Sequence, residues 1–152
     1  MIDYIFAILN NDVLQYSVEN VNNSFMLGQH RGPENSVLKN VMINADYGFH
    51  RLAINGLNDN SNQPICLDNI VLICNGEIYN YKELYKIMSD VKPETNSDCE
   101  VIIHLYIKYG IEHTLQMLDG VFAFCLLDTR DCFHKSKHYR VPGANVRRKG
   151  IR

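Results

Sequence analysis

The 152-residue sequence lacks the features that mark membrane, secreted and thiol-rich metal-binding proteins. No apolar run approaches the roughly 18 residues that a membrane-spanning helix needs. The N-terminus has neither the basic segment nor the cleavage site of a secretory signal. None of the five cysteines belongs to a Cys-x-x-Cys pair, so we expect free thiols in a reducing, cytoplasmic compartment.

Ligand-binding motifs are also sparse. The six histidines show no metal-ligand spacing, and His104 and His113 have no carboxylate or cysteine at the expected ligand positions. No glycine-rich phosphate loop occurs. The sequence therefore predicts no metal site and no cofactor in this chain.

The net charge of −2 hides an asymmetry. Residues 1–129 carry 16 acidic and 7 basic side chains, whereas residues 130–152 carry 1 acidic and 8 basic side chains. An acidic body with a basic tail results. The tail has no interleaved aromatic residues, so nucleic-acid binding is a weak expectation.

The first half of the chain alternates strand-like runs with polar segments. Residues 2–10, 13–18, 41–45 and 47–54 are predicted strands. Residues 20–40 are polar and contain Gly28, Gly32 and Pro33, which predicts a long functional loop. Residues 70–74 form an apolar strand that is expected to end at Asn75-Gly76.

The second half is mainly helical. Residues 78–88 have helical spacing, and Ser97 with Glu100 forms a capping box that opens a second helix. Gly110 ends this helix, residues 111–118 form another short helix, and residues 121–127 read as a buried strand. Strands followed by helices and a strand predict an α+β fold with helices outside the sheet.

Six short motifs carry the most specific signal. In chain order they are Ile5-Phe6-Ala7-Ile8, Arg31-Gly32-Pro33-Glu34, Phe49-His50-Arg51-Leu52-Ala53-Ile54, Gln63-Pro64, Cys74-Asn75-Gly76-Glu77-Ile78-Tyr79-Asn80-Tyr81 and Ser97-Asp98-Cys99-Glu100. Their order and spacing resemble the glutaminase domain, a class II glutamine amidotransferase, of glutamine-hydrolysing asparagine synthetases. The resemblance covers about residues 5–128.

The resemblance implies a four-layer αββα sandwich of antiparallel sheets, the fold of N-terminal-nucleophile hydrolases. Nothing in residues 131–152 resembles the closing strand or the ATP-using domain that follows in the family. We therefore expect a fold that is incomplete at the C-terminus, with an amidotransferase-like domain at 1–129 and an irregular or disordered tail at 130–152. A truncated or frame-disrupted C-terminus is the preferred explanation. An open sheet edge would favour self-association.

The nucleophile of the family is missing. Where the family has cysteine and then glycine, this chain has Asp3 and Tyr4. In the family the cysteine thiol attacks the glutamine amide, with its own α-amine as base. Here the amine of Met1 would lie up to roughly 7 Å upstream of Asp3 along an extended chain. A carboxylate is a weak nucleophile, so we expect hydrolysis to be lost.

The remaining pocket residues of the family are matched. Arg51 matches the arginine that binds the substrate carboxylate, and Asp98 matches the carboxylate that binds its ammonium. Asn75 and Gly76 match the oxyanion hole, and Glu77 matches a residue near the substrate amine. Each match has a purely structural alternative. Arg51 could be a surface residue on a strand, Asp98 and Glu77 could stabilise helix N-termini, and Asn75-Gly76 could be a simple turn.

Two further motif positions leave alternatives open. The segment Arg31-Gly32-Pro33-Glu34 matches a loop at the pocket mouth that faces the synthetase domain, and the bland reading is a solvated loop. Cys74 could in principle replace the nucleophile, but strand alternation favours a core thiol.

Two functions are therefore compatible with the sequence. The chain could bind glutamine and supply ammonia for asparagine synthesis from aspartate by a separate synthetase chain, which would bind the ATP and magnesium. Alternatively, it is a pseudoenzyme that binds glutamine or docks a partner without catalysis, or a decaying gene remnant. Because Asp3 replaces cysteine, activity of the isolated chain is not expected.

Overall fold

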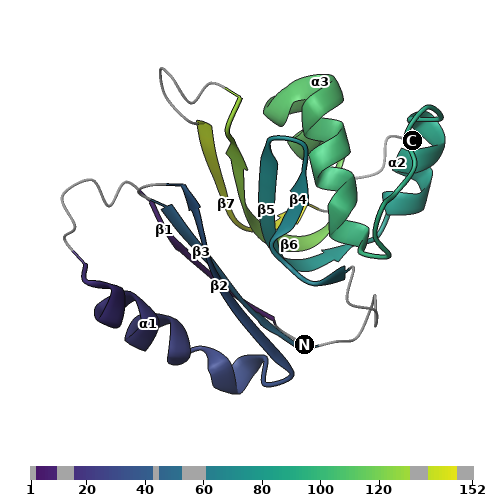
Figure 1. The fold of residues 1–152 in the computed structure, drawn as a ribbon. Coiled ribbons are helices and arrows are strands. Elements are labelled where there is room, and N and C mark those ends of the chain that lie inside the picture. The colour runs from purple at the N-terminus through teal and green to yellow at the C-terminus, as the bar shows by residue number, and fades with distance from the viewer. Residues whose placement is uncertain (1–2, 10–15, 43–44, 53–60, 131–136, 147–152) are drawn as a thin grey trace.

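A computed structural model of the chain describes residues 3–9, 16–42, 45–52, 61–130 and, by their backbone, 137–146. These residues form a mixed α+β fold with two antiparallel sheets and three helices (Figure 1). The strands are β1 (Tyr4–Ile8), β2 (Asn35–Met42), β3 (Ala45–Arg51), β4 (Ile65–Leu67), β5 (Ile70–Ile78), β6 (Gly120–Asp128) and β7 (Lys137–Val146). The helices are α1 (Val18–Met26), α2 (Tyr81–Ile87) and α3 (Val101–Met117), with short 3-10 turns at Gln29–Arg31 and Asp98–Glu100.

The first sheet has the strand order β1-β3-β2, and the second has the order β4-β5-β6-β7. Side chains alternate across both sheets, so each sheet has two faces with different partners. Tyr47 of β3 packs with Ile73 of β5 and Leu127 of β6 in one apolar cluster. This cluster joins the first sheet to the second.

The outer face of the first sheet is covered by α1 (Figure 1). Phe25 of α1 stacks on His50 of β3 with ring centroids 3.9 Å apart, and His50 Nε2 hydrogen-bonds to the Phe25 carbonyl at 2.8 Å. Ser36 of β2 contacts the other ring nitrogen at 2.7 Å. A fully buried histidine thus links the helix to both strands.

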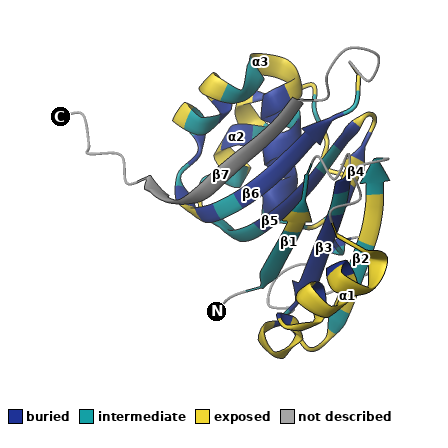
Figure 2. Cartoon of the chain, turned by 90° about the vertical axis from the view of Figure 1, so that its left-hand side faces the viewer, coloured by how far each residue is buried: buried dark blue, intermediate teal, exposed yellow. Residues whose placement is uncertain are grey.

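The other face of the second sheet carries the largest apolar cluster, to which α2 and α3 contribute. Leu72 of β5, Phe124 of β6 and Ile102 of α3 are among its fully buried side chains. Figure 2 shows that β3 and β6 are buried along most of their length, whereas α1 is largely exposed. No helix in the described residues is long and apolar enough to cross a membrane.

Several expectations from the sequence are confirmed. Strand β1 lies within the run at 2–10, α2 lies within residues 78–88, and β6 contains the run at 121–127, although Val121 itself is exposed. Gly110 interrupts α3 with a φ of 76° and a ψ of 171°, a conformation that glycine adopts readily. The predicted strand at 47–54 is described only as far as Leu52, because residues 53–60 lie outside the described residues.

The predictions for residues 13–40 are wrong at α1 and β2, whereas residues 27–34 between these elements do form a loop, with a 3-10 turn at Gln29–Arg31. Ser17 caps α1 by accepting a hydrogen bond from the Asn20 amide at 3.2 Å, so Val18 begins a helix rather than ending a strand. Val21 and Phe25, four residues apart, bury one side of this asparagine-rich helix. Strand β2 follows within the predicted loop. Tertiary contacts with the sheet select both elements.

Two further local predictions are corrected. Strand β5 does not end at Asn75-Gly76 but continues to Ile78, because β6 pairs with it along its whole length. Ser97 does cap its turn through the Cys99 amide at 3.3 Å. Glu100, however, does not complete a capping box, because its carboxylate binds the amides of residues 94 and 95 instead.

The expectation of an irregular tail is wrong for residues 137–146. These residues form β7, which pairs antiparallel with β6 from Asp128↔Lys137 to Gly120↔Val146. The edge of β6 is therefore paired, although we expected a sheet edge left open by a missing closing strand. The division of the chain at residue 129 stays a prediction.

Candidate functional site

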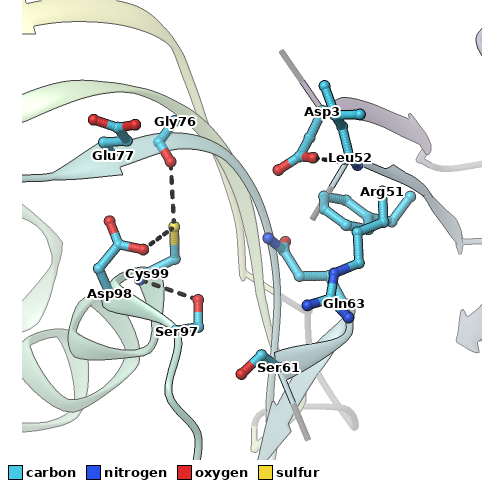
Figure 3. Close-up of a pocket in the computed structure, with 11 residues that line it drawn as sticks. Asp3, Arg51, Leu52, Ser61, Gln63, Gly76, Glu77, Ser97, Asp98 and Cys99 are labelled. Atoms are coloured by element: carbon cyan, nitrogen blue, oxygen red, sulfur yellow. Dashed lines mark hydrogen bonds between the residues drawn. The ribbon is translucent and has the colours of Figure 1, made fainter. Parts of the chain in front are cut away.

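A small cavity of about 50 Å³ lies where the end of the first sheet approaches β5 and the turn before α3. Figure 3 shows the two walls, with Asp3, Arg51 and Gln63 on one side and Gly76, Glu77, Asp98 and Cys99 on the other. Five separate chain segments contribute to it. The lining residues are Asp3, Phe49, Arg51, Leu52, Ser61, Gln63, Gly76, Glu77, Ser97, Asp98 and Cys99.

Asp3 is placed by the pairing of β1 with β3. Tyr4 lies opposite His50, so the residue before Tyr4 reaches the end of β3. There the Asp3 Oδ1 atom accepts a hydrogen bond from the Leu52 amide at 2.8 Å. Burial raises the pKa of the Asp3 carboxyl, and although the Leu52 bond and the Arg51 charge oppose this, the net effect is a raised pKa.

Arg51 is the last residue of β3 and is almost fully buried, with an exposed fraction of 8%. Its guanidinium donates to the side chain of Asn62, and its carbonyl accepts from the Glu34 amide at 3.2 Å. A buried guanidinium at a cavity wall is suited to an anionic partner, because its planar fork matches a carboxylate.

Asp98 lies on the opposite wall, in the turn that leads into α3. Its Oδ2 atom accepts a hydrogen bond from the Ile78 amide at 2.6 Å, which fastens this turn to the end of β5. Burial raises the pKa of the Asp98 carboxyl, and the negative charge of Glu77 acts in the same direction. Two carboxylates with raised pKa values thus line one cavity.

Gly76 lines the cavity at a point where β5 lies very close to β6. Its φ of +147° is unfavourable for residues with a Cβ, and a Cβ here would lie 2.1 Å from the Val121 carbonyl oxygen. Asn75 pairs with Ala123 in β6 and is not among the cavity-lining residues. Glu77 is. The structure therefore brings Gly76 and Glu77 to the cavity but leaves Asn75 outside its lining.

The loop at residues 31–34 packs beside the cavity. A Cβ at Gly32 would lie 2.3 Å from the backbone carbonyl of His50, so the loop backbone lies directly against β3. The charge of Glu34 is close enough to contribute to the raised pKa of Asp3. This loop thus lies near Asp3, and its role at the pocket mouth stays a prediction.

Cys74 is not part of the cavity wall. It is fully buried in the cluster between the second sheet and the helices, which confirms the prediction of a core thiol. Cys99 does line the cavity, and its Sγ atom lies 3.9 Å from the Gly76 carbonyl oxygen. A hydrogen bond to Cys74 and burial raise the pKa of the Cys99 thiol well above its usual range, so it stays protonated near neutral pH.

Sequence reasoning did not assign Gln63 and Ser61 to the cavity. The Gln63 side chain bonds to both the amide (2.5 Å) and the carbonyl (2.8 Å) of Cys74, in the manner of a neighbouring strand. Ser61 accepts from the Asn96 amide at 3.3 Å and so ties this segment to the turn before α3. The Gln63-Pro64 motif could have pointed to Gln63. The hydrogen bonds of the Gln63 side chain to the Cys74 backbone, however, depend on contacts between distant segments that the motif does not reveal.

Glu100 supports the wall that carries Asp98. Its fully buried carboxylate accepts from the Glu94 and Thr95 amides at 2.7 and 2.6 Å and from His104 at 2.9 Å. Burial raises the pKa of Glu100, but these hydrogen bonds outweigh burial and leave the pKa lowered. His104 therefore does have a carboxylate partner, contrary to the expectation from the sequence.

Comparison with known proteins identifies the family. A family model for the glutamine amidotransferase domain matches residues 5–134. Asparagine synthetase [glutamine-hydrolyzing] of Mesocricetus auratus is 48% identical over 109 residues, which covers 66% of this chain and 18% of that protein. Asparagine synthetase [glutamine-hydrolyzing] 1 of Arabidopsis thaliana is 48% identical over 106 residues, which covers 68% of this chain and 18% of that protein. The asparagine synthetase [glutamine-hydrolyzing] of Homo sapiens is 46% identical over 109 residues, which covers 66% of this chain and 18% of that protein.

The matched region thus spans under a fifth of the length of these relatives. It nevertheless includes most of this chain, and the family model covers both walls of the cavity apart from Asp3. The chain belongs to the glutamine amidotransferase domain family and is homologous to the glutamine-hydrolysing asparagine synthetases.

Proposed function

We propose that the chain is an asparagine synthetase-type amidotransferase domain that binds glutamine in the cavity but does not hydrolyse it. The observation that carries the proposal is the meeting of Asp3, Arg51, Gly76 and Asp98 around one cavity. These four residues come from four distant parts of the sequence. We also propose that the two sheets and flanking helices form the αββα sandwich of N-terminal-nucleophile hydrolases.

The two walls suit the two charges of an amino-acid head group. The Arg51 guanidinium would bind the α-carboxylate, and the Asp98 carboxylate would bind the α-ammonium. Asp98 is held in place by the Ile78 amide, so its position does not depend on the ligand. Glu77 lines the same wall and would add a second acceptor for the ammonium.

The glutamine side chain would extend toward Gly76 and Asp3. The family's oxyanion hole is assigned to Asn75 and Gly76, of which Gly76 lines the cavity. In the position of the nucleophile stands a carboxylate that already accepts a hydrogen bond from the Leu52 amide. Attack by this carboxylate on an amide would form a strained mixed anhydride, so the proposal assigns binding without hydrolysis.

The role in the cell follows from the relatives. A domain that supplied ammonia would deliver it to a synthetase domain that binds aspartate, ATP and magnesium. A domain that only binds glutamine would instead report its presence to such a partner. The intact pocket walls favour a ligand-binding pseudoenzyme over a docking-only remnant, because docking alone needs neither Arg51 nor Asp98 in a cavity.

Binding and hydrolysis are tested separately. Isothermal titration calorimetry measures glutamine binding to the full chain, to Asp98→Asn and to the control Glu112→Gln, which changes an exposed carboxylate of α3 outside the cavity. We expect Asp98→Asn to weaken binding at least tenfold and Glu112→Gln to leave it unchanged. Equal affinities in all three proteins would contradict the pocket assignment.

Hydrolysis is measured as glutamate released from glutamine by the purified chain. We expect no release above that of Asp98→Asn. Release that exceeds this background and disappears in Asp3→Ala would identify an unorthodox glutaminase and overturn the proposed loss of activity.

A further inference from the structure

We infer that the cavity selects an amino acid with a cationic side chain of ornithine length over glutamine, with the Asp3 carboxylate binding the terminal ammonium. The inference rests on the proposed function, because it keeps Arg51 and Asp98 as the partners of the amino-acid head group. It changes the chemical class of the ligand, from a neutral amide to an α,ω-diamino acid.

The charge balance of the walls is the first argument. Among the described residues that line the cavity, Asp3, Glu77 and Asp98 carry carboxylates and Arg51 carries the one cation. A zwitterionic head group matches Arg51 with its carboxylate and Asp98 with its ammonium. The carboxylates of Asp3 and Glu77 then remain, and a neutral side chain would not balance them. A ligand with one additional positive charge neutralises one of these two carboxylates, and Asp3 is the one beside its side chain.

The placement of Asp3 is the second argument. Figure 3 shows its carboxylate directed into the space between the walls, toward the side that holds Gly76. The backbone hydrogen bond from Leu52 fixes this orientation through Oδ1. A carboxylate has acceptor positions beyond one such bond, so a ligand ammonium can bind without displacing Leu52. Partial burial makes this pairing stronger than on an open surface.

The length of the ligand is the third argument. In ornithine the terminal nitrogen is the same number of bonds from Cα as the amide nitrogen of glutamine. A cavity that takes glutamine therefore places an ornithine ammonium where the family's chemistry places the amide, beside residue 3. The ammonium brings a full charge and three donors, and charge-assisted hydrogen bonds are roughly twice as strong as neutral ones.

The size of the cavity also ranks a longer diamino acid below ornithine. Lysine has one more methylene, which the small cavity of about 50 Å³ would have to accommodate. One methylene typically changes selectivity by about 10- to 200-fold in a shaped pocket. We expect lysine to bind more weakly than ornithine, with the difference set by cavity size rather than by charge.

The test is calorimetric titration of the full chain with L-ornithine, L-lysine and L-glutamine at pH 7. We expect ornithine to bind at least tenfold more tightly than glutamine. Asp3→Asn keeps the size of the side chain and the acceptor for Leu52 but removes the charge, so it should lower the ornithine-to-glutamine affinity ratio at least tenfold. Glu112→Gln should leave this ratio unchanged.

Each other outcome is decisive. Glutamine binding that equals or exceeds ornithine binding, and that is lost in Asp98→Asn, overturns the inference but leaves the proposed function standing. Ornithine binding that Asp98→Asn does not weaken places the ligand outside the cavity and also overturns it. Binding of none of the three amino acids overturns both proposals. The comparison of ligands on the unaltered chain needs no variant to fold.

Discussion

At the scale of single residues, the cavity places carboxylates where burial disfavours their charged form. Asp3 and Asp98 both have raised pKa values, with burial as the largest cause in each case. Glu100 shows that burial alone does not decide the direction, because its hydrogen bonds lower its pKa despite full burial. At neutral pH the charged forms of Asp3 and Asp98 therefore destabilise the ligand-free fold, and an oppositely charged ligand would offset this cost.

We predict that Asp3→Asn stabilises the ligand-free chain at pH 7. Because the folded-state pKa is raised above the ordinary value of 3.8, the folded protein binds more protons than the unfolded chain just above pH 3.8. Stability therefore falls as pH rises through this window and stays lower at neutral pH. The asparagine has no such loss and still accepts from Leu52.

Thermal unfolding of both proteins between pH 3 and pH 8 measures this effect. The gain in melting temperature should be largest near neutral pH and vanish below pH 3.8. Glu112→Gln is the matched control for removal of one negative charge, and it should show a much smaller gain. A lower melting temperature of Asp3→Asn at pH 7 would contradict the prediction.

At the scale of elements, close contact between β5 and β6 determines the shape of the cavity wall. The Asn75-Gly76 pair does not end the strand, since the backbone pairing with β6 continues to Ile78↔Gly120. Glycine is needed at residue 76 for its φ of +147° and for the approach of β6. At residue 110 glycine also has a positive φ, but no atom lies within 4 Å of a Cβ placed there.

This contrast predicts different costs for the same substitution. Gly110→Ala should destabilise the chain by about 1–3 kcal/mol, the cost of an unfavourable backbone conformation. Gly76→Ala adds a clash with the Val121 carbonyl, so its cost should exceed that of Gly110→Ala by about 1 kcal/mol or more. Urea unfolding of both variants measures the free energies, and equal costs would refute the clash.

At the scale of the whole molecule, strand β6 of the second sheet is paired along both of its edges. Strand β5 pairs with β6, and β7 covers the other edge of β6. An unpaired edge exposes a row of amides and carbonyls that favours pairing with another chain. The self-association that we expected of an open β6 edge is therefore expected of a chain that lacks β7.

We predict that a chain ending at residue 136 self-associates at concentrations at which the full chain does not. Its β6 edge would lose all of its pairs with residues 137–146. Sedimentation velocity over a concentration series measures the difference. A chain ending at residue 146 is the control and should behave like the full chain. A monomeric chain ending at residue 136 would show that the edge of β6 does not drive association.

The sequence alone determined several features. The motifs around Arg51, Asn75 and Asp98 predicted the family. A continuous apolar run predicted β6, helical spacing predicted α2, and the glycine at residue 110 predicted the end of a helix. The sequence also predicted that Asp3 stands in the place of the family's cysteine. These signals are local, because each depends on residue types within a few positions.

The tertiary structure decided what local patterns do not encode. Helix α1 has few apolar residues, and its stability depends on Phe25 stacking on His50, a contact between distant segments. Strand β7 has no strand-like period and exists through pairing with β6. The approach of Asp3, Arg51 and Asp98 to one cavity depends on the register of β1 with β3 and on the Ile78–Asp98 bond. Long-range pairing, rather than residue periodicity, therefore builds the site.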